Sequence, residues 1–160
     1  MFTHLLPDTA PYRYWRLVTT ATLAGASAPV NYVDLRYIVG ATAYPTSNMT
    51  GDSTPSPLVA SATSTNGSFS LGPYQAFDGD AGTYWISNST PPASITIDFG
   101  AGRLIRPNAI RITPRVGRAP TAFQVLASNT GAFGGEQRTI YAVTGLTTGW
   151  TDDVARTIPI

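Results

Sequence analysis

The sequence predicts an all-β protein folded as a sandwich, and three observations support this prediction. Apolar residues almost nowhere recur with helical periodicity. Short runs rich in Val, Ile, Thr, Tyr and Phe alternate with clusters of Gly, Pro, Ser and Asn, and the spacing of these clusters is short. Strands and turns in this pattern are typical of β-sandwiches. A chain of 160 residues has the usual size of one domain and can bury a core without disulfides, which a cysteine-free sequence cannot form.

The expected strands follow one another along the chain. Each is a run of β-branched and aromatic residues that ends near a turn residue. In order, they are residues 12–19, 31–39, 58–62, 83–85, 94–99, 109–114, 122–127, 138–142 and 156–160. The turn-rich stretch 42–57 holds no core pattern and is expected to cross the surface as a long connection. Residues 1–11 are expected to be a tail, and 12–160 the domain.

Alternation within a strand predicts which face is buried, because successive side chains point to opposite faces. Apolar and polar residues alternate in the run Ile95, Thr96, Ile97, Asp98 and Phe99. One face of this strand is therefore expected in the core and the other in water. The strand 109–114 alternates in the same way. Trp15 and Trp85 also sit in alternating strands and are expected in the core.

Charge and residue content exclude several classes of function. Only 12% of the residues are charged, the net charge is +1, and every basic residue is an arginine. A nucleic-acid-binding domain would carry a strong basic patch. The chain has one histidine, one glutamate (Glu136), no cysteine and no lysine, and no nucleophile elbow or phosphate loop. Neither an enzyme nor a nucleic-acid partner is expected.

The sequence also gives no signal for membranes. The N-terminus has neither the basic region nor the long apolar region of a secretory signal. No apolar run approaches the roughly 18 residues that a spanning helix needs. Insertion into a membrane is therefore not expected.

The loop of residues 75–85 is the most informative segment. It gathers two carboxylates, two glycines and a threonine between the apolar residues Phe77 and Trp85. Glycines allow a tight turn that aims several backbone carbonyls at one point. Carbonyls, carboxylates and a hydroxyl suit a hard cation such as calcium. The alternative is an acidic surface hairpin, since Asp-Gly is a common turn dipeptide.

The same loop resembles the Ala-Ile-Asp-Gly-Asn/Asp-x-x-Thr-x-Trp signature of discoidin domains (coagulation factor 5/8 type C; family 32 carbohydrate-binding modules). Three later segments are also similar to that family. They are the strand 94–100, written Ser-Ile-Thr-Ile-Asp-Phe-Gly, the Pro-Arg loop in 111–118, and the strand 121–131. The resemblance implies a jelly-roll-like β-sandwich of the galactose-binding-like type.

The order of the family's segments is unusual in this chain. Residues 12–17, Tyr-Arg-Tyr-Trp-Arg-Leu, and 32–37, Tyr-Val-Asp-Leu-Arg-Tyr, resemble segments that close most discoidin domains, but here they come first. The chain therefore resembles a circularly permuted discoidin domain, an order associated with bacteriophage virion and tail proteins. Permutation predicts that residues 156–160 lie beside residues 12–17.

The resemblance implies a calcium site with six oxygen ligands. The implied ligands are the carbonyls of Gln75, Asp80 and Val33, the carboxylates of Asp78 and Asp34, and Thr83. Asp34 stands where the family has glutamate and is one methylene shorter. The alternative is a hydrogen-bonded turn without metal.

The resemblance also implies a carbohydrate site at one end of the sandwich. Arg115 matches the arginine of the Pro-Arg loop, and Arg118 or Trp150 are expected to help it. An arginine fork can bind neighbouring hydroxyls, and an aromatic face can stack on a sugar ring. The candidate aromatic residues are Phe69, Tyr74, Phe133 and Trp150. Ile86 stands where many sugar-binding members have a ligand-touching histidine. The alternative makes Arg115 a solvated loop charge.

These features together predict a non-enzymatic protein of a virion surface, on tail or head. Its expected partners are a host-surface glycan and other virion proteins, and many copies are expected in one assembly. One alternative is a purely structural or decoration protein of the virion that binds no ligand. Another is a bacterial surface-attachment domain.

Overall fold

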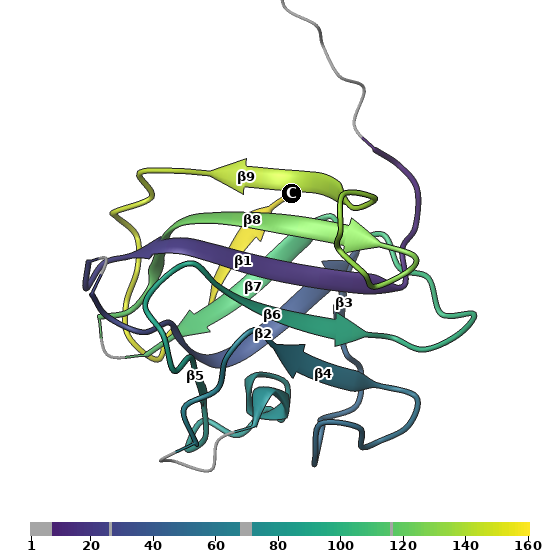
Figure 1. Cartoon of the computed structure of the whole chain (residues 1–160), viewed down its shortest axis with the longest axis horizontal. Helices are drawn as coiled ribbons and strands as arrows, with labels where there is room; N and C mark the ends of the chain where they lie inside the picture. The colour runs from purple at the N-terminus through teal and green to yellow at the C-terminus, as the bar shows by residue number, and fades with distance from the viewer. Residues whose placement is uncertain (1–7, 26, 68–71, 116) are drawn as a thin grey trace, which may run out of the picture.

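The computed structural model describes residues 8–25, 27–67, 72–115 and 117–160. In this part of the chain, the strands form two antiparallel sheets that face each other (Figure 1). The predicted all-β sandwich is confirmed. The same residues include no helix with the length and apolar character of a membrane span.

The first sheet has β1 at its centre. Its strands, in spatial order, are β4 (Val59–Ala62), β6 (Ala93–Asp98), β1 (Tyr14–Thr22), β8 (Pro120–Ser128) and β9 (Arg138–Val143). Trp15 of β1 lies opposite Ile97 on one side and Ala127 on the other. The first expected strand therefore becomes the central one of this sheet.

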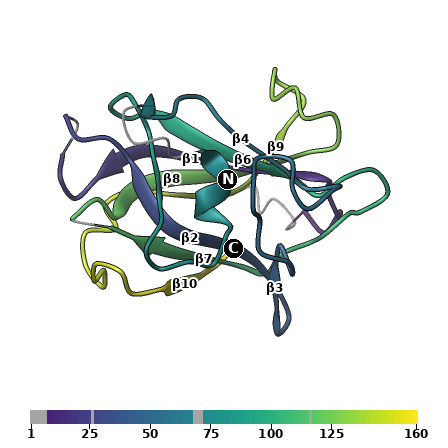
Figure 2. The same ribbon diagram turned by 90° about the horizontal axis from the view of Figure 1, so that it is seen from below.

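The second sheet is built on β2. Its strands, in order, are β10 (Arg156–Pro159), β7 (Ala109–Pro114), β2 (Asn31–Val39) and β3 (Thr42–Tyr44), and β5 (Trp85–Ile86) also pairs with β2. A short 3-10 helix, η2 (Pro73–Ala76), lies below the sheets in Figure 1 and in front of them in Figure 2. The pairing of β5 with the start of β2 brings residues 84–86 to one end of the sandwich.

The core lies between the sheets and is rich in aromatic rings. Trp15 and Trp85 are both fully buried, as the alternation predicts. The ring of Trp15 packs on that of Tyr37 from the opposite sheet, with centroids 5.5 Å apart. Truncating a buried ring of this size typically costs on the order of 3–5 kcal/mol. These cross-sheet contacts hold the two layers together.

The outer face of β6 is not as wet as the alternation predicts. Thr96 is only 5% exposed. The reason is Arg16 on the neighbouring strand, whose Nε donates to the Thr96 hydroxyl at 2.8 Å. The ring of Phe133, from the loop between β8 and β9, lies 3.8 Å from the Arg16 guanidinium. A loop therefore covers this face, and the expectation of a solvated one is wrong at Thr96.

The stretch 42–57 also differs from the prediction of a surface connection without core residues. It contains β3, which pairs with the end of β2. Met49 within it is 1% exposed and belongs to the hydrophobic core. A single apolar residue among turn residues leaves no periodic pattern, so the burial of Met49 could not be predicted from periodicity.

The two ends of the chain lie in different sheets, so residues 156–160 do not pair with residues 12–17. β1 is central in the first sheet, whereas β10 is the edge strand of the second and pairs with β7 (Figure 2). Both ends instead contact the segment before β7. Tyr12 exchanges backbone hydrogen bonds with Ile105, and the Ile160 amide donates to the Asn108 carbonyl at 3.1 Å. The circular permutation stays a prediction.

The expected tail is tied down from Asp8 onward, and its first seven residues lie outside the described part of the chain. The Tyr12 hydroxyl donates to the Asp8 carboxylate at 2.6 Å, and Arg106 Nε donates to the Asp8 carbonyl at 2.7 Å. The last residues of the expected tail therefore pack against the domain.

A single glutamate organises the loop between β8 and β9. The Glu136 carboxylate accepts hydrogen bonds from the hydroxyls of Ser128 and Thr130, at 2.5 and 2.6 Å, and from the amides of Phe133 and Gly134. These bonds, that of Ser128 first, lower the pKa of Glu136 from 4.5 to about 2. The ionised carboxylate thus holds the loop that carries Phe133.

We expect the Glu136→Gln variant to melt at a lower temperature than the parent at neutral pH. Because the folded-state pKa lies below the unfolded value, this contribution is present above about pH 4.5 and is lost as the pH falls through about 2. Thermal melts across this range should show the difference shrinking. A difference that does not change with pH would mean that the charge plays no part.

Gly100 follows β6 and is expected to tolerate no side chain. Its φ is +92°, and a Cβ there would lie 2.5 Å from Pro57. The Gly100→Ala variant should lose about 2–4 kcal/mol of unfolding free energy, from backbone strain and the clash together. Gly102→Ala is the matched control, since φ is +75° but nothing lies within 4 Å. Gly102→Ala should lose only about 1–2 kcal/mol of unfolding free energy. Denaturant titration of both variants measures the two losses. Equal losses would show that the contact with Pro57 is unimportant.

Candidate ligand-binding site

The loop after η2 is held by its own side chains. The Asp80 amide donates to Asp78 Oδ1 at 2.9 Å, and the Gly82 amide donates to Asp80 Oδ1 at 2.8 Å. The Thr83 hydroxyl lies 2.6 Å from Asp78 Oδ2 and 3.1 Å from the Asp80 carbonyl. Aspartates favour such turns because their short side chains reach the backbone amide two residues on.

Three of the predicted calcium ligands therefore converge. A hydroxyl carries one proton, so Thr83 can donate either to Asp78 or to the Asp80 carbonyl, but not to both. One of these two acceptor oxygens therefore lies beside the Thr83 oxygen with no proton between them. A hard cation can satisfy two such oxygens at once. Gln75, whose backbone carbonyl is a further predicted ligand, lies on η2 just before this loop. The loop side of the predicted site fits a calcium ion.

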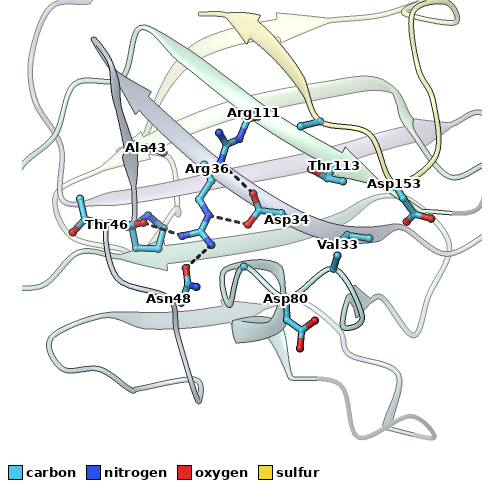
Figure 3. A pocket seen from close by; sticks show the side chains of 14 residues that line it. Val33, Asp34, Arg36, Ala43, Thr46, Asn48, Asp80, Arg111, Thr113 and Asp153 are labelled. Atoms are coloured by element: carbon cyan, nitrogen blue, oxygen red, sulfur yellow. Dashed lines mark hydrogen bonds and ion pairs between the residues drawn. The ribbon is translucent and has the colours of Figure 1, made fainter.

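The predicted remote pair lies across a cavity from this loop. The cavity has a volume of about 510 Å³, and its lining includes Val33 and Asp34 from β2 and Gly79 and Asp80 from the loop (Figure 3). The register between β2 and β7 shifts between Tyr32 and Asp34, which leaves Val33 as the extra residue of a bulge. Bulges re-aim residues and interrupt the hydrogen-bond ladder. The structure thus brings the remote pair and the loop to one cavity.

The Asp34 carboxylate already has two cationic partners. Arg36 Nε donates to Asp34 Oδ1 at 2.8 Å, and Arg111 Nη2 lies 3.5 Å from Asp34 Oδ2 (Figure 3). Arg36 is only 5% exposed, and its other nitrogens donate to the Pro45 carbonyl and to Asn48 Oδ1. A cation held by Asp34 would compete with these two guanidinium groups.

The implied ligand set therefore fits calcium in part. The oxygens of Asp78, Asp80 and Thr83 suit the ion, and the bulge at Val33 suits a carbonyl ligand. Asp34 fits less well because arginines surround it. No group of three or more acidic, histidine or cysteine side chains that could hold a metal occurs in the described ranges. A calcium ion here would depend largely on carbonyl and hydroxyl oxygens.

A second cavity, of about 330 Å³, lies where β7 ends. It is lined by Pro29, Asn31, Asn66, Tyr84, Ile86, Arg115 and Arg118. Its volume lies within the range of about 300–1,000 Å³ that is usual for small-ligand sites. Arg115 and Arg118, which the sequence predicts as ligand-binding residues, therefore share one cavity.

Local structure explains how the two arginines meet. β7 ends at Pro114, and Gly117 then adopts a φ of +65°, so that the chain turns back. The Arg118 amide donates to the Arg115 carbonyl at 3.2 Å across this turn. Both side chains thereby project from one short loop beside Tyr84.

Tyr84 and Asn31 complete the cavity. The guanidinium of Arg115 lies over the Tyr84 ring, 4.5 Å from its centroid. Asn31 stands opposite Ile86 in the pairing of β2 with β5. Asn31 is 4% exposed, and its amide oxygen has no hydrogen-bond partner among the described residues. A buried acceptor left without a donor costs about 1–3 kcal/mol, so a ligand that donates to it would bind favourably.

The other predicted ligand-binding residues do not line this cavity. Trp150 donates from its indole nitrogen to the Leu146 carbonyl at 3.0 Å, and the Arg156 guanidinium covers its ring. Phe133 contacts Arg16, on the outer face of the first sheet. Tyr74 belongs to η2. Phe69 lies outside the described residues.

Sequence reasoning missed Tyr84 and Asn31. One signal could have found Tyr84: it precedes the buried Trp85, so alternation sends its side chain the other way. No local signal identifies Asn31, which reaches the cavity only because β2 pairs with β5. The aromatic ring beside Arg115 is therefore Tyr84, and the guanidinium covers one face of it.

The fold is thus a two-layer β-sandwich with two cavities beside its loops. The family model for the F5/8 type C domain matches residues 59–157, which is more than half of the chain. The protein therefore belongs to the F5/8 type C family, the discoidin domains, and the predicted resemblance is confirmed. Domains of this family bind carbohydrates or other ligands and are typically non-enzymatic.

The match begins at β4 and leaves out residues 12–17 and 32–37, on which the permuted order depends. No curated protein and no solved structure matched the chain.

Proposed function

We propose that the protein is a non-enzymatic carbohydrate-binding domain that takes a sugar in the cavity beside Arg115. The observation that carries the proposal is the meeting of two guanidinium groups, those of Arg115 and Arg118, with the Tyr84 ring and the unpartnered amide oxygen of Asn31. The family's known ligands support the same conclusion.

These groups match the chemistry of a sugar. A guanidinium fork donates two parallel hydrogen bonds, which suits neighbouring hydroxyl oxygens. The Asn31 oxygen accepts a hydrogen bond from a hydroxyl, and the apolar side chain of Ile86 provides a surface for a sugar's C–H groups. Ile86 replaces the histidine of many sugar-binding relatives, so the arginines and Asn31 carry the polar contacts.

We further propose that many copies act together on the surface of a bacteriophage virion, where they hold host glycans. The support for this setting is the order of the family's segments along the chain, which resembles that of phage virion and tail proteins. Single sugar sites are commonly weak, and display in many copies raises the overall affinity without new contacts. The alternative is a decoration protein that binds no ligand. Labelling of virions with an antibody against the protein tests whether it lies on the virion surface.

Calcium is the cofactor that we propose for the loop. The support is that one carboxylate oxygen of Asp78 and the carbonyl of Asp80 lie 2.6 and 3.1 Å from the Thr83 hydroxyl. We propose Asp34 only as a secondary calcium ligand, because its carboxylate also neutralises Arg36.

The glycan proposal is tested with Arg115→Ala displayed on a multivalent support. Binding to host cells and to purified surface polysaccharide should fall by about tenfold or more, because a charge-assisted contact of about 1.5–3 kcal/mol is lost in each site. Arg103→Ala is the matched control: it also removes one arginine, but an exposed one from the loop that precedes β7, at the other end of that strand. A folded Arg115→Ala protein that adheres as well as the parent would make Arg115 a solvated charge. A parent that adheres to nothing favours the decoration protein.

The calcium proposal is tested by melting the protein with calcium and with a chelator. At a hundredfold excess over Kd, an ion that binds only the folded state adds about 2.7 kcal/mol. Asp78→Asn should abolish this increment. Asp34→Asn should lower stability in both conditions, by about 3–5 kcal/mol, because it leaves the buried Arg36 without its carboxylate. If it also abolishes the increment, Asp34 is a ligand. Identical melting of the parent in both conditions would rule out the ion.

A further inference from the structure

We propose that the cavity beside Arg115 selects an acidic sugar, one that carries an anionic group next to its hydroxyls. This inference deepens the proposed function and rests on it. The cavity's charge, the free donors of its arginines and its one buried acceptor lead to it independently of the family.

The first argument is the charge of the cavity. All nine acidic residues of the chain lie in the described ranges, and none of them lines this cavity. Neither Arg115 nor Arg118 forms an ion pair with any described residue, whereas Arg13, Arg36 and Arg111 all do. Two arginines without an ion pair therefore stand together. The Asp152 carboxylate reaches the same loop, where it accepts from the Gly117 amide at 2.7 Å, but it neither lines the cavity nor pairs with either guanidinium.

The larger cavity gives a direct contrast. Its arginines, Arg36 and Arg111, face Asp34, and Asp80 and Asp153 also line it. Positive charge there is balanced from within the protein. No acidic side chain lines the cavity beside Arg115, so an anionic ligand there meets guanidinium groups that no ion pair holds.

The second argument is the orientation of the guanidinium groups. Arg115 lies over the Tyr84 ring, which leaves the N–H groups at the edge of its plane for a ligand. Among described residues its side chain makes no hydrogen bond, and that of Arg118 makes a single long one, 3.5 Å to the Pro29 carbonyl. A carboxylate or sulfate group accepts two parallel N–H bonds from such a fork. Most donors of both arginines are thus available to an anion.

The third argument separates an acidic sugar from a simple anion. The Asn31 oxygen is a buried acceptor without a donor, and a fully deprotonated anion such as sulfate has no hydrogen-bond donor to give it. A neutral sugar could donate to Asn31 but would leave both guanidinium charges uncompensated. A sugar with hydroxyls and one anionic group satisfies both requirements at once.

The experiment compares acidic polysaccharides with their neutralised counterparts. The probes are polygalacturonate, alginate and hyaluronan with their carboxyl-reduced forms, and a sulfated galactan with its desulfated form, next to a panel of neutral glycans. Binding of the intact protein on a multivalent support is measured by surface-based titration. We expect at least one acidic polymer to bind, and its neutralised form to bind about tenfold more weakly or worse.

Variants connect this preference to the cavity. Arg115→Gln and Arg118→Gln should each lower binding of the acidic polymer more than binding of its neutralised form. Arg103→Gln is the matched control, because it lowers the net charge by the same amount from an exposed loop outside the cavity. If Arg103→Gln lowers binding as much, the attraction is to the whole protein's charge and the inference fails.

The outcomes for the parent protein keep the two proposals apart. Equal binding of an acidic polymer and its neutralised form, or binding to neutral glycans alone, overturns the acidic selectivity and leaves a carbohydrate site. Binding to no polymer or glycan overturns both. The sulfated and carboxylated arms identify which anionic group the cavity takes.

Discussion

The buried guanidinium of Arg36 is the interaction on which the arrangement around β2 depends. Its nitrogens donate to Asp34 on the same strand, to the Pro45 carbonyl and to Asn48. Burying an ion costs several kcal/mol unless partners surround it, so each of these contacts is needed. Together they attach residues 45–48 to β2, although that segment has little regular structure of its own.

Asn48, which Arg36 holds in place, also packs closely against the loop after η2. Gly79 has a φ of +71°, and a Cβ there would lie 2.7 Å from the Asn48 side chain. The glycine between the two aspartates is therefore required twice, by the backbone conformation and by the close approach of Asn48. The loop also holds itself through the Asp78 and Asp80 turns. A cation that binds here meets ligands already in position, which lowers the entropy cost of binding.

Much of the fold could be predicted because strand alternation is a local property. β2 and β7 have the bounds that the sequence predicts, residues 31–39 and 109–114. The failures arise where contacts join distant segments. Thr96 is buried by Arg16 and Phe133, and Met49 enters the core from a turn-rich stretch. Periodicity in one strand does not reveal what another segment lays over it.

The candidate site divides in the same way. The Pro-Arg motif identified Arg115, and Arg118 follows within the same short loop. Asn31 and Tyr84 could not be assigned from any motif, because the pairing of β2 with β5 alone brings them to that loop. Trp150 was a reasonable candidate by residue type, but its ring is covered by Arg156. Site membership here is a consequence of strand pairing more than of residue type.

The ten arginines of this lysine-free chain differ in role because their surroundings differ. Arg36 is buried and neutralised by Asp34, and Arg13 is paired with Asp98 where β1 begins and β6 ends. Such arginines stabilise the fold, because carboxylates of the protein already match their hydrogen-bond donors and charges. Arg115 and Arg118 share a loop and a cavity with Tyr84, but neither forms an ion pair with a described carboxylate. Removing an arginine of the first kind should disturb folding, and removing one of the second kind should change only what the protein binds.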